Sequence, residues 1–453
     1  MSSKPGISFI GLGAMGFGMA TNLVKQGYTV RGFDVWGPAL YKFRGVGGQG
    51  AATPAEAVRN LPHCVCMVAT MQQAQEVLFQ GPSPAAKALP QGATLLLCST
   101  VPAAYVQGLE EQLKKEGRGD IFLVDCPVSG GAGRAADGTL SIMASGSEAA
   151  LAKARFLLQE MSDPAKLYMV KPEGSGQRGI GMGSNMKMCH QVLAANQILA
   201  ASEAMGFAAR MGLDLTKVGQ EVIKSDAWSW MFENRLPRML HPENKSIASA
   251  VTIILKDTSI ITAQGRLLKF PTPMCSVAEQ VYFASLSRGY GADDDSSLIR
   301  LYTEGAENVG KVQGEVTDEG AKVQLVIKLL KAIHLCSAAE AIRFGAHVGL
   351  DLDQLSELCN AAAGGSKLFE TAGAVIIRNL RAGNGSRGWP ADTVSLGDVT
   401  QDLQEAVDEA QRLKCPLFLG NQALNLLTMA SRSVQSGSEA AEGSVVTNWC
   451  AIT

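Results

Sequence analysis

The most constraining feature of the sequence is a glycine-rich turn close to its N-terminus. An apolar run, Ile7 to Ile10, leads directly into a GxGxxG motif at residues 11–16, and an amphipathic helical pattern follows. Glycines at this spacing allow a tight turn, a close approach of the backbone to a pyrophosphate, and close packing of the helix on the strand. The free N–H groups at the start of that helix then face the phosphates. The motif predicts a dinucleotide-binding βαβ unit, with cofactor contacts from Gly11, Leu12, Gly13, Ala14, Met15 and Gly16.

An aspartate follows at the position where such a unit binds the ribose. Asp34 ends the next strand-like run, and its carboxylate is suited to accept hydrogen bonds from both ribose hydroxyls of NAD. The same charge would repel the 2′-phosphate of NADP, and residues 35–37 include no arginine. Arg31 lies inside the strand, and Lys42 and Arg44 come late. The sequence therefore favours NAD over NADP.

Short apolar runs alternate with helical patterns through the first third of the chain. Strands that alternate with helices form a parallel sheet with helices on both faces. Because such strands are buried on both sides, they are continuously apolar. The runs are residues 7–10, 29–33, 64–69, 94–98 and 121–124. They predict an α/β Rossmann domain with a doubly wound, mostly parallel sheet.

The remainder of the chain reads as helical and is divided by polar stretches. Asp, Pro, Lys and Gly cluster at residues 163–179, after which long Ala-, Leu- and Met-rich helical patterns begin. A second polar stretch, residues 311–320, divides this helical region in two. The predicted domains are an NAD-binding domain at 1–170, a first, catalytic helical domain at 171–314, and a second helical domain at 315–453.

The two helical parts are repeats of one another. The segment ASEAMGFAARMGLDL at 201–215 recurs as AAEAIRFGAHVGLDL at 338–352, 137 positions later. After a short insertion, KDTSIITAQGRLLKFP at 256–271 matches QDLQEAVDEAQRLKCP at 401–416. Register held over so many positions indicates a duplication.

Composition excludes several classes of protein. Lys and Arg number 40 against 42 Asp and Glu, so the chain lacks the basic surface that a nucleic-acid partner requires. Ten irregularly spaced cysteines are typical of reduced thiols in the cytoplasm, and the N-terminus has no secretory pattern. The sequence also has no apolar stretch of about 18 residues, which argues against a membrane span. The five histidines lack metal-ligand spacing, so no metal is expected.

Four stretches together resemble a known family. FIGLGAMGFGMATNLVKQGYTV, LLLCSTV at 95–101, DCPVSGGAGRAADGTL at 125–140 and GMGSNMKMCHQVL at 181–193 are similar to motifs of the β-hydroxyacid dehydrogenases, the group of 3-hydroxyisobutyrate dehydrogenase. Within that group, Lys187-Met-Cys-His190-Gln and the segment 229–235 resemble the L-threonate dehydrogenases, whereas many relatives carry Asn where His190 stands. The resemblance covers residues 1 to about 300.

The resemblance implies a catalytic role for Lys187. This lysine lies on an otherwise apolar helix, so its ammonium must either snorkel to solvent or sit in a functional pocket. A lysine desolvated there can take or give the alcohol proton as hydride moves. His190 is three residues on and shares the same helix face, where it could orient Lys187 or bind a substrate hydroxyl.

Further residues are assigned to the substrate. Ser129, Gly130 and Gly131 follow a strand and offer a hydroxyl and backbone N–H groups, a suitable nest for a carboxylate. Phe232, Asn234 and Arg235 are expected to line the substrate side. Arg235 could hold a carboxylate bidentately, and a structural ion pair is the alternative.

Other residues are assigned by the resemblance to the cofactor side. Thr100 matches a residue near the nicotinamide, and Met71 and Gln73 lie on the equivalent rim, although MQQ departs from the commoner Met-Leu-Pro. Lys256 and Asp257 match a Lys-Asp pair that reaches the cofactor, with a solvated surface pair as the alternative.

The second repeat has lost these chemical groups. Lys187 is matched by Gln324, His190 by Ile327 and Lys256 by Gln401, and glutamine cannot perform the proton transfer of a tuned lysine. We therefore interpret the second repeat as structural. Our hypothesis is that it replaces a partner subunit, which would make the chain a monomeric internal pseudo-dimer or a unit of a higher assembly.

Together these features predict NAD-dependent oxidation of a small hydroxy acid, L-threonate-like or 3-hydroxyisobutyrate-like. One alternative is an NADPH-dependent reductase of small aldehyde or keto acids. The other is a non-catalytic dinucleotide-binding sensor. Retention of Lys187 and the Ser129-Gly130-Gly131 loop argues against the sensor.

Overall fold

The computed structural model describes residues 4–173, 179–241, 246–304, 318–382, 394–433 and 440–449. The chain forms two compact units. The first comprises Met1–Lys187 with Gly349–Gln354, and the second comprises Met188–Val348 with Leu355–Thr453. The predicted boundary between residues 314 and 315 lies outside the described residues, and the three predicted domains stay predictions.

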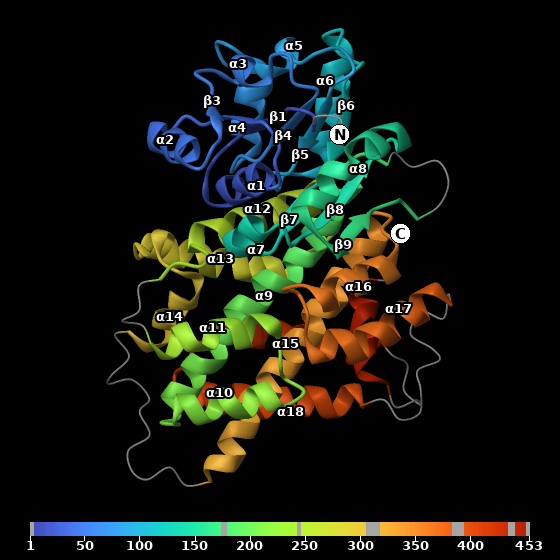
Figure 1. Ribbon diagram of the computed structural model, residues 1–453. Coiled ribbons are helices and arrows are strands. Elements are labelled where there is room, and N and C mark those ends of the chain that lie inside the picture. Colours follow the sequence, from blue (N-terminus) through green and yellow to red (C-terminus); the bar gives the residue numbers. More distant parts are fainter. Residues whose placement is uncertain are drawn as a thin grey trace. The chain divides into compact units, whose positions relative to one another are not determined.

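The first unit is built on a twisted sheet whose strand order is β3-β2-β1-β4-β5-β6-β8-β7, with β9 beside β8 (Figure 1). The pairs from β3 to β6 are parallel, whereas β8 is antiparallel to β6 and β7. The strands are β1 Ile7–Ile10, β2 Val30–Phe33, β3 Gln49–Gly50, β4 His63–Cys66, β5 Thr94–Leu97, β6 Phe122–Asp125, β7 Val128–Ser129, β8 Leu140–Gly146 and β9 Ser162–Met169. The strand order reverses between β1 and β4, which is where sheets of this kind bind ligands.

Helices cover both faces of this sheet. Alternate residues of β1 belong to opposite cores, since Phe9 packs with one cluster and Ile10 with the other. Burial on both faces explains the continuously apolar strands and confirms the predicted Rossmann architecture. The helices are α1 Ala14–Lys25, α2 Gly37–Gly45, α3 Pro54–Val58, α4 Met71–Gln75, the π-helix η1 Glu76–Gln80, α5 Ala85–Ala88, α6 Ala103–Lys115, α7 Gly131–Asp137 and α8 Glu148–Met161.

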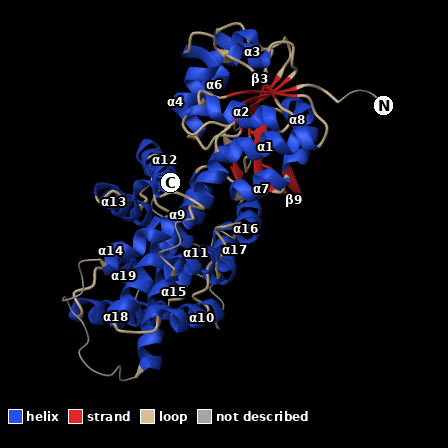
Figure 2. Ribbon diagram, turned by 60° about the vertical axis from the view of Figure 1, so that its left-hand side comes forward, coloured by secondary structure: helices blue, strands red, loops and turns tan. Residues whose placement is uncertain are grey.

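The rest of the described chain is helical, and the strands of Figure 2 are confined to the first unit. The first repeat contains α9 Met182–Arg210, α10 Leu215–Lys224, α11 Trp230–Leu240, α12 Val251–Leu267, α13 Pro273–Ser287, η2 Tyr290–Ala292, η3 Asp295–Ile299 and α14 Arg300–Thr303. The second contains α15 Glu319–His347, α16 Leu352–Ala361, η4 Phe369–Gly373, α17 Ala374–Arg381, α18 Leu396–Arg412, α19 Phe418–Ser433 and η5 Glu442–Trp449. Helix α9 is long and apolar enough to cross a membrane, but it is almost entirely buried within the protein, as a core helix is.

The two repeats are built alike, element by element. Helices α9 and α15 each have 29 residues and begin 137 positions apart. Helices α12 and α18 each have 17 residues. The hydrophobic pattern that duplicated in sequence therefore produces the same helices twice.

Reciprocal contacts join the repeats. The Glu203 carboxylate accepts hydrogen bonds from Leu419 N (3.1 Å) and Gly420 N (2.9 Å) at the start of α19. The Glu340 carboxylate accepts the corresponding bonds from Met274 N (2.8 Å) and Cys275 N (3.0 Å) at the start of α13. Each glutamate therefore caps a helix of the other repeat.

The same reciprocity appears where Ser229 and Ser366, which are equivalent residues, form an antiparallel bridge. Trp230 N donates to Gly365 O at 2.9 Å, and Lys367 N donates to Trp228 O at 3.1 Å. An interface in which each contact recurs with the two sides exchanged has isologous, two-fold character.

Candidate active site

The glycine motif forms an open cradle at the carboxyl end of β1. Gly11 has φ +95°, and a Cβ there would lie 2.2 Å from Met67 O, so only glycine fits. A Cβ on Gly16 would lie 2.0 Å from Gly11 O, which shows how closely α1 packs on the turn. Gly13, at the N-cap of α1, has open space instead, and within the described chain no side chain caps this helix. The turn therefore leaves N–H groups and room for a phosphate, and it fits a dinucleotide.

Asp34 is tied to this cradle. Its Oδ2 accepts from Leu12 N at 2.6 Å and its Oδ1 from Trp36 N at 2.8 Å. Each carboxylate oxygen has a second lone pair, so both can still accept a ribose hydroxyl. The carboxylate is held at the end of β2 as the sequence predicts, and it fits the ribose of a dinucleotide.

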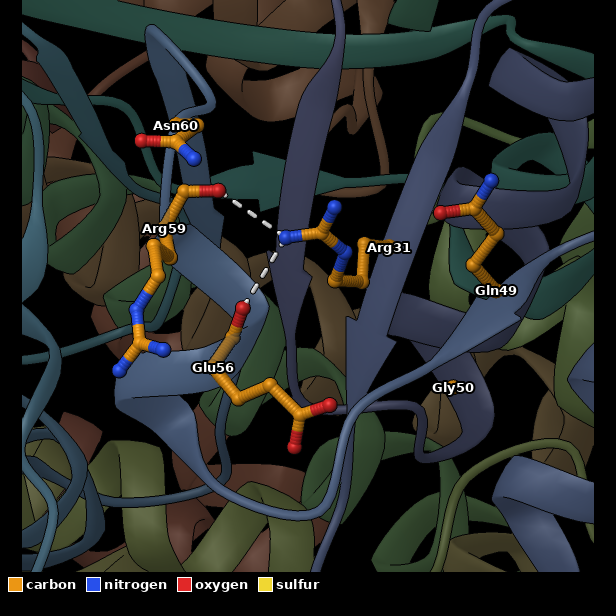
Figure 3. Close-up of a pocket in the computed structure, with 6 residues that line it drawn as sticks. All are labelled: Arg31, Gln49, Gly50, Glu56, Arg59 and Asn60. Atoms are coloured by element: carbon orange, nitrogen blue, oxygen red, sulfur yellow. Dashed lines mark hydrogen bonds between the residues drawn. The ribbon is translucent and has the colours of Figure 1, made fainter.

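The cations near β2 have other partners. The Arg31 guanidinium donates to Glu56 O (3.1 Å) and Arg59 O (3.0 Å) at the wall of a surface cavity of about 490 Å³ (Figure 3). Lys42 lies over the ring of Trp36, with Nζ 5.8 Å from the ring centroid. Arg31 is thus held away from the end of β2, whereas Lys42 stands beside the segment that follows Asp34.

Met71, Gln73 and Thr100, which the sequence assigns to the cofactor side, lie in and beside the loops that follow β4 and β5. Met71 begins α4 and is 38% exposed. The Gln73 side chain accepts from Ala69 N at 2.9 Å, so it stabilises the loop before α4. Thr100 follows β5 and is partly exposed. Contact of these residues with a cofactor stays a prediction.

The predicted carboxylate nest lies between β7 and α7. Gly130 and Gly131 have φ values of +140° and +73°, a conformation that other residues rarely adopt. A Cβ on Gly130 would meet Arg134 Cδ at 2.9 Å, whereas one on Gly131 would meet open space. Ser129 ends β7 and is partly exposed. The loop therefore presents an open backbone surface of the kind that binds a carboxylate.

A buried aspartate, which sequence reasoning missed, holds the helix that carries Lys187. Asp125 ends β6, and its Oδ2 accepts from Ser184 N (2.8 Å) while its Oδ1 accepts from Ser184 Oγ (2.7 Å). Ser145 Oγ donates to Asp125 at 3.2 Å and accepts from Gly183 N at 2.9 Å. Burial raises the pKa of Asp125 to about 6, against the lowering effect of the bonds from Ser184 and Ser145. Its place in the DCPVSGG motif was the available signal.

Lys187 is buried one turn after this clamp. It is 5% exposed, so its ammonium does not snorkel to solvent. His190, one further turn along α9, is 1% exposed. The predicted pair is thus placed on one continuous buried helix, and its catalytic role stays a prediction.

His190 belongs to a hydrogen-bond chain that joins α9 to α12. Its Nδ1 lies 2.9 Å from Gln191 Oε1, and Gln191 Nε2 donates to Asp257 Oδ2 at 2.6 Å. Lys256 Nζ lies 2.9 Å from Asp257 Oδ1. Asp257 is 6% exposed, whereas the Lys256 side chain is 26% exposed, so only the carboxylate of the predicted Lys-Asp pair is buried, and contact of the pair with a cofactor stays a prediction. Gln191 is a member that the sequence did not single out.

Arg235 has a protein partner for its guanidinium. Its Nε and Nη2 donate to the two oxygens of Asp295 at 3.0 and 2.8 Å, which is the structural ion-pair alternative. Asn234 accepts from Arg235 (3.1 Å) and from Arg238 (3.2 Å). Phe232 is fully buried near the start of α11. Their contact with a substrate stays a prediction. Among the described residues, no group of three or more His, Cys, Asp or Glu side chains gathers to hold a metal.

Two family models match the chain. Residues 6–170 match the NAD binding domain of 6-phosphogluconate dehydrogenase. Residues 181–302 and again 319–446 match the NAD-binding domain of NADP-dependent 3-hydroxyisobutyrate dehydrogenase. The same model therefore matches both helical repeats.

Relatives match about two thirds of the chain's length. L-threonate dehydrogenase of Cupriavidus necator is 36% identical over 307 residues, 68% of this chain and 99% of the relative. The mitochondrial 3-hydroxyisobutyrate dehydrogenase of Mus musculus is 30% identical over 310 residues, 67% of this chain and 89% of the relative. Each of these alignments thus leaves about a third of this chain unmatched.

Solved structures of dehydrogenases have a similar fold. A 3-hydroxyisobutyrate dehydrogenase from Salmonella typhimurium superposes with a TM-score of 0.59 at 31% identity, over 66% of this chain and all of that chain. The 6-phosphogluconate dehydrogenase of Plasmodium falciparum superposes with a TM-score of 0.68 at 15% identity, over 96% of this chain and 93% of that chain. The second structure shares the fold across both repeats.

Proposed function

Because the chain belongs to the family of NAD-binding 6-phosphogluconate and 3-hydroxyisobutyrate dehydrogenases, we propose that it oxidises a small hydroxy acid with NAD. The observation that carries this proposal is a buried lysine on a helix that a buried aspartate fixes to the nucleotide-binding sheet. A lysine is retained in such surroundings where it has a task that compensates for the cost of burial.

The proposed reaction uses groups of the first unit. The glycine motif and Asp34 would hold the dinucleotide, which supplies a hydride acceptor when bound. The Ser129-Gly130-Gly131 loop would bind the carboxylate of the substrate through backbone N–H groups. The neutral amine of Lys187 would accept the hydroxyl proton at Nζ while hydride leaves the carbinol carbon. The product is the corresponding keto or aldehyde acid.

An L-threonate-like acid is the substrate that the similarity favours. The relatives at 33–36% identity are named L-threonate dehydrogenases, whereas those named 3-hydroxyisobutyrate dehydrogenases are 29–30% identical. The His190-Gln191 pair agrees with this choice, since a buried polar pair suits a hydroxylated substrate better than a methyl-branched one.

We further propose that the second repeat replaces a partner subunit. The reciprocal glutamate caps and the Ser229–Ser366 bridge support this proposal, because they have the two-fold character of an isologous interface. Gly364 supports it as well: a Cβ there would lie 3.3 Å from His190 Cδ2, so the second repeat covers the edge of a predicted site residue.

The cytoplasm is the compartment that we propose. The nine described cysteines are all buried free thiols, which agrees with a reducing environment.

A reductase that uses NADPH is the second candidate. Lys42 beside Trp36 favours it, since a cation close to the ribose end can attract a 2′-phosphate. One of the matched family models also names an NADP-dependent enzyme.

Initial rates with NAD and with NADP against three- to five-carbon hydroxy and sugar acids test the proposal. We expect turnover with NAD and the highest kcat/KM for a four-carbon sugar acid. The reverse direction, with NADPH and small aldehyde acids, tests the second candidate. Binding of NAD without turnover of any acid in either direction would contradict both and favour a sensor.

A further inference from the structure

A surface cavity of the first unit lies away from the predicted dinucleotide site. Its volume of about 490 Å³ is in the range of small-molecule sites. It is lined by Arg31, Gln49, Gly50, Glu56, Arg59 and Asn60 (Figure 3). These residues come from the first half of β2, from β3, and from the end of α3 and the loop that leads to β4. Asp34, at the carboxyl end of β2, is three residues or about 10 Å beyond Arg31, so the cavity is a separate place on the same domain.

Arg31 is anchored through one of its three guanidinium nitrogens. Its Nη1 donates to Glu56 O at 3.1 Å and to Arg59 O at 3.0 Å, so both hydrogens of Nη1 are used. The two carbonyls lie at the end of α3, where a helix leaves backbone oxygens without partners. This structural role does not involve Nε and Nη2, which carry the other three hydrogens. Within the described residues, no acceptor pairs with these two nitrogens.

Arg118, in the same unit, shows what the Nε–Nη2 edge of a guanidinium binds. Its Nη1 donates to a backbone carbonyl, as Nη1 of Arg31 does. Its Nε and Nη2 donate to the two oxygens of Asp120 at 2.9 and 3.1 Å. Arg235 holds Asp295 by the same two nitrogens. This edge matches the two oxygens of a carboxylate or a phosphate, and Arg31 is a comparable arginine to which the described chain supplies no such anion.

The other side chains around the cavity add one charge of each sign and two amides. The Arg59 guanidinium is exposed, and no carboxylate of the described chain pairs with it. Glu56 Oε2 accepts from Ala52 N at 2.8 Å, which leaves Oε1 able to accept from a ligand. The side-chain amides of Gln49 and Asn60 also have no partner in the part of the chain that the structure describes. The cavity therefore offers two cationic groups, two amides and one acceptor.

We propose that this cavity binds a small hydroxylated phosphate monoester, a ligand of the sugar-phosphate class. Two guanidinium groups match the charge of a phosphate monoester, about −1.5 to −2 at neutral pH, better than that of a single carboxylate. The Glu56 carboxylate repels an anion and accepts from a hydroxyl, so the phosphate lies against Arg31 and Arg59 and a hydroxyl of the ligand lies against Glu56. This binding site goes beyond the proposed function and does not depend on it.

Isothermal titration calorimetry of the full-length protein with glycerol 3-phosphate tests the proposal. We expect a Kd below about 1 mM, and binding of inorganic phosphate that is about fivefold weaker because this anion lacks the alcohol hydroxyls. Phosphates also bind at helix N-termini such as that of α1, so each titration is repeated with saturating NAD. The Kd for glycerol 3-phosphate should then stay within about twofold. Displacement by NAD would overturn the proposal, since the ligand would then occupy the dinucleotide site.

Three arginine variants assign the binding to the cavity. Arg31→Lys keeps the charge and removes the Nε–Nη2 edge, and we expect it to weaken the binding of glycerol 3-phosphate about tenfold. Arg59→Met removes an exposed side chain and should weaken binding about threefold, and it serves as the test if Arg31→Lys fails to fold. Arg155→Met is the matched control, because Arg155 is an exposed arginine of α8 that does not line the cavity. It should leave the Kd unchanged.

Glu56→Gln tests the class of ligand. The amide oxygen of glutamine can still accept from Ala52 N, whereas its nitrogen cannot accept from a hydroxyl. We expect the preference for glycerol 3-phosphate over inorganic phosphate to fall to about twofold or less. Equal affinity of the wild type for the two anions, a Kd above about 10 mM for both, or binding that neither Arg31→Lys nor Arg59→Met weakens would overturn the proposal. The titrations need no turnover, so a failure of the proposed function leaves their result unchanged.

Discussion

The two helical repeats have the same architecture and different chemistry. Helices α9 and α15 have equal length, and the glutamates at equivalent positions, Glu203 and Glu340, cap each other's repeat with the same pair of bonds. The residues assigned to the reaction differ, since the equivalent of Lys187 in the second repeat is Gln324 and the equivalent of His190 is Ile327. The second repeat therefore has the residues that form the interface but not those assigned to the reaction.

A duplicated domain can therefore keep the residues that form an interface and lose the residues that take part in a reaction. Burying a carboxylate without partners costs several kcal/mol, so a glutamate at a fully buried interface persists only while its partners do. Gln324, at the position equivalent to Lys187, is exposed, so the packing of the second repeat does not depend on the residue that stands there. The second repeat then remains as packing surface.

The largest effect is expected from exchanging the residues at the equivalent positions 187 and 324. Lys187→Gln copies the residue that the second repeat already carries, and it removes the proposed proton acceptor. We expect kcat to fall at least about 100-fold with little change in unfolding temperature, because general base catalysis contributes about 10²–10⁴-fold. Steady-state rates and thermal unfolding measure the two quantities. Gln324→Lys is the matched control and should leave kcat within about twofold; a wild-type rate in Lys187→Gln would exclude the proposed role.

The starts of α9 and α15 offer the next comparison. Asp125 holds α9 from another element while fully buried, whereas Asp318 caps α15 from the preceding position, accepting from Ala321 N at 3.1 Å. Asp125→Ala leaves the N–H of Ser184 and its hydroxyl without their acceptor, and we expect a loss of about 3 kcal/mol in unfolding free energy. Asp318→Ala should cost about 1 kcal/mol. Urea unfolding measures both, and equal losses would contradict the buried clamp.

The reciprocal glutamates predict a shared pH dependence. Burial raises the pKa of Glu203 and of Glu340 to about 7, although backbone N–H groups oppose this shift. Between pH 4.5 and 7 the folded protein therefore holds protons that the unfolded chain releases, so this contribution to stability falls as pH rises and is constant above about 7.

We expect the double variant Glu203→Gln and Glu340→Gln to abolish this decrease in unfolding free energy between pH 4.5 and 7. Each single variant should remove about half of the decrease. At pH 8 each single variant should cost about 1–2 kcal/mol, since the amide nitrogen of glutamine cannot accept the hydrogen bonds made to one of the two carboxylate oxygens. Chemical unfolding at several pH values measures this. An effect of one single variant with no effect of the other would argue against a two-fold interface, whereas a moderately larger effect at Glu203 is expected because this carboxylate also accepts from the Tyr302 hydroxyl at 3.2 Å.

Much of the fold follows from the sequence because its signals are local. Continuous apolar runs identified the central parallel strands, and a 3.6-residue periodicity identified the long helices. Strands β7 to β9 were not among the predicted runs, because they are short or interrupted by polar residues such as those of Ser162–Met169. Strand β8 pairs antiparallel with β6 and with β7, so these pairs are the antiparallel part of a sheet that the sequence predicted as mostly parallel.

The site could be predicted less completely because its key contacts join distant residues. The bond from Ser184 to Asp125 spans 59 positions and that from Gln191 to Asp257 spans 66, and no periodicity reports such pairings. Arg235 is a further example. Its guanidinium can bind any carboxylate bidentately, and the sequence does not show that the fold places Asp295 beside it. The sequence identified residue types suited to the chemistry, whereas the structure supplied their partners.

The smallest effect is expected where the second repeat covers His190. Gln197 Nε2 donates to Gly364 O at 2.9 Å, and a Cβ on Gly364 would lie 3.3 Å from both His190 Cδ2 and Leu193 Cδ1. Gly364→Ala must therefore displace the imidazole by a few tenths of an ångström, and we expect KM to rise about threefold with kcat less affected, as for a small loss of binding energy. Ala227→Gly, at the equivalent position of the first repeat, is the control for loop flexibility and should leave KM unchanged. If both variants raise KM equally, the effect comes from the loop and not from pressure on His190, and the second repeat then shapes the fold without shaping the site.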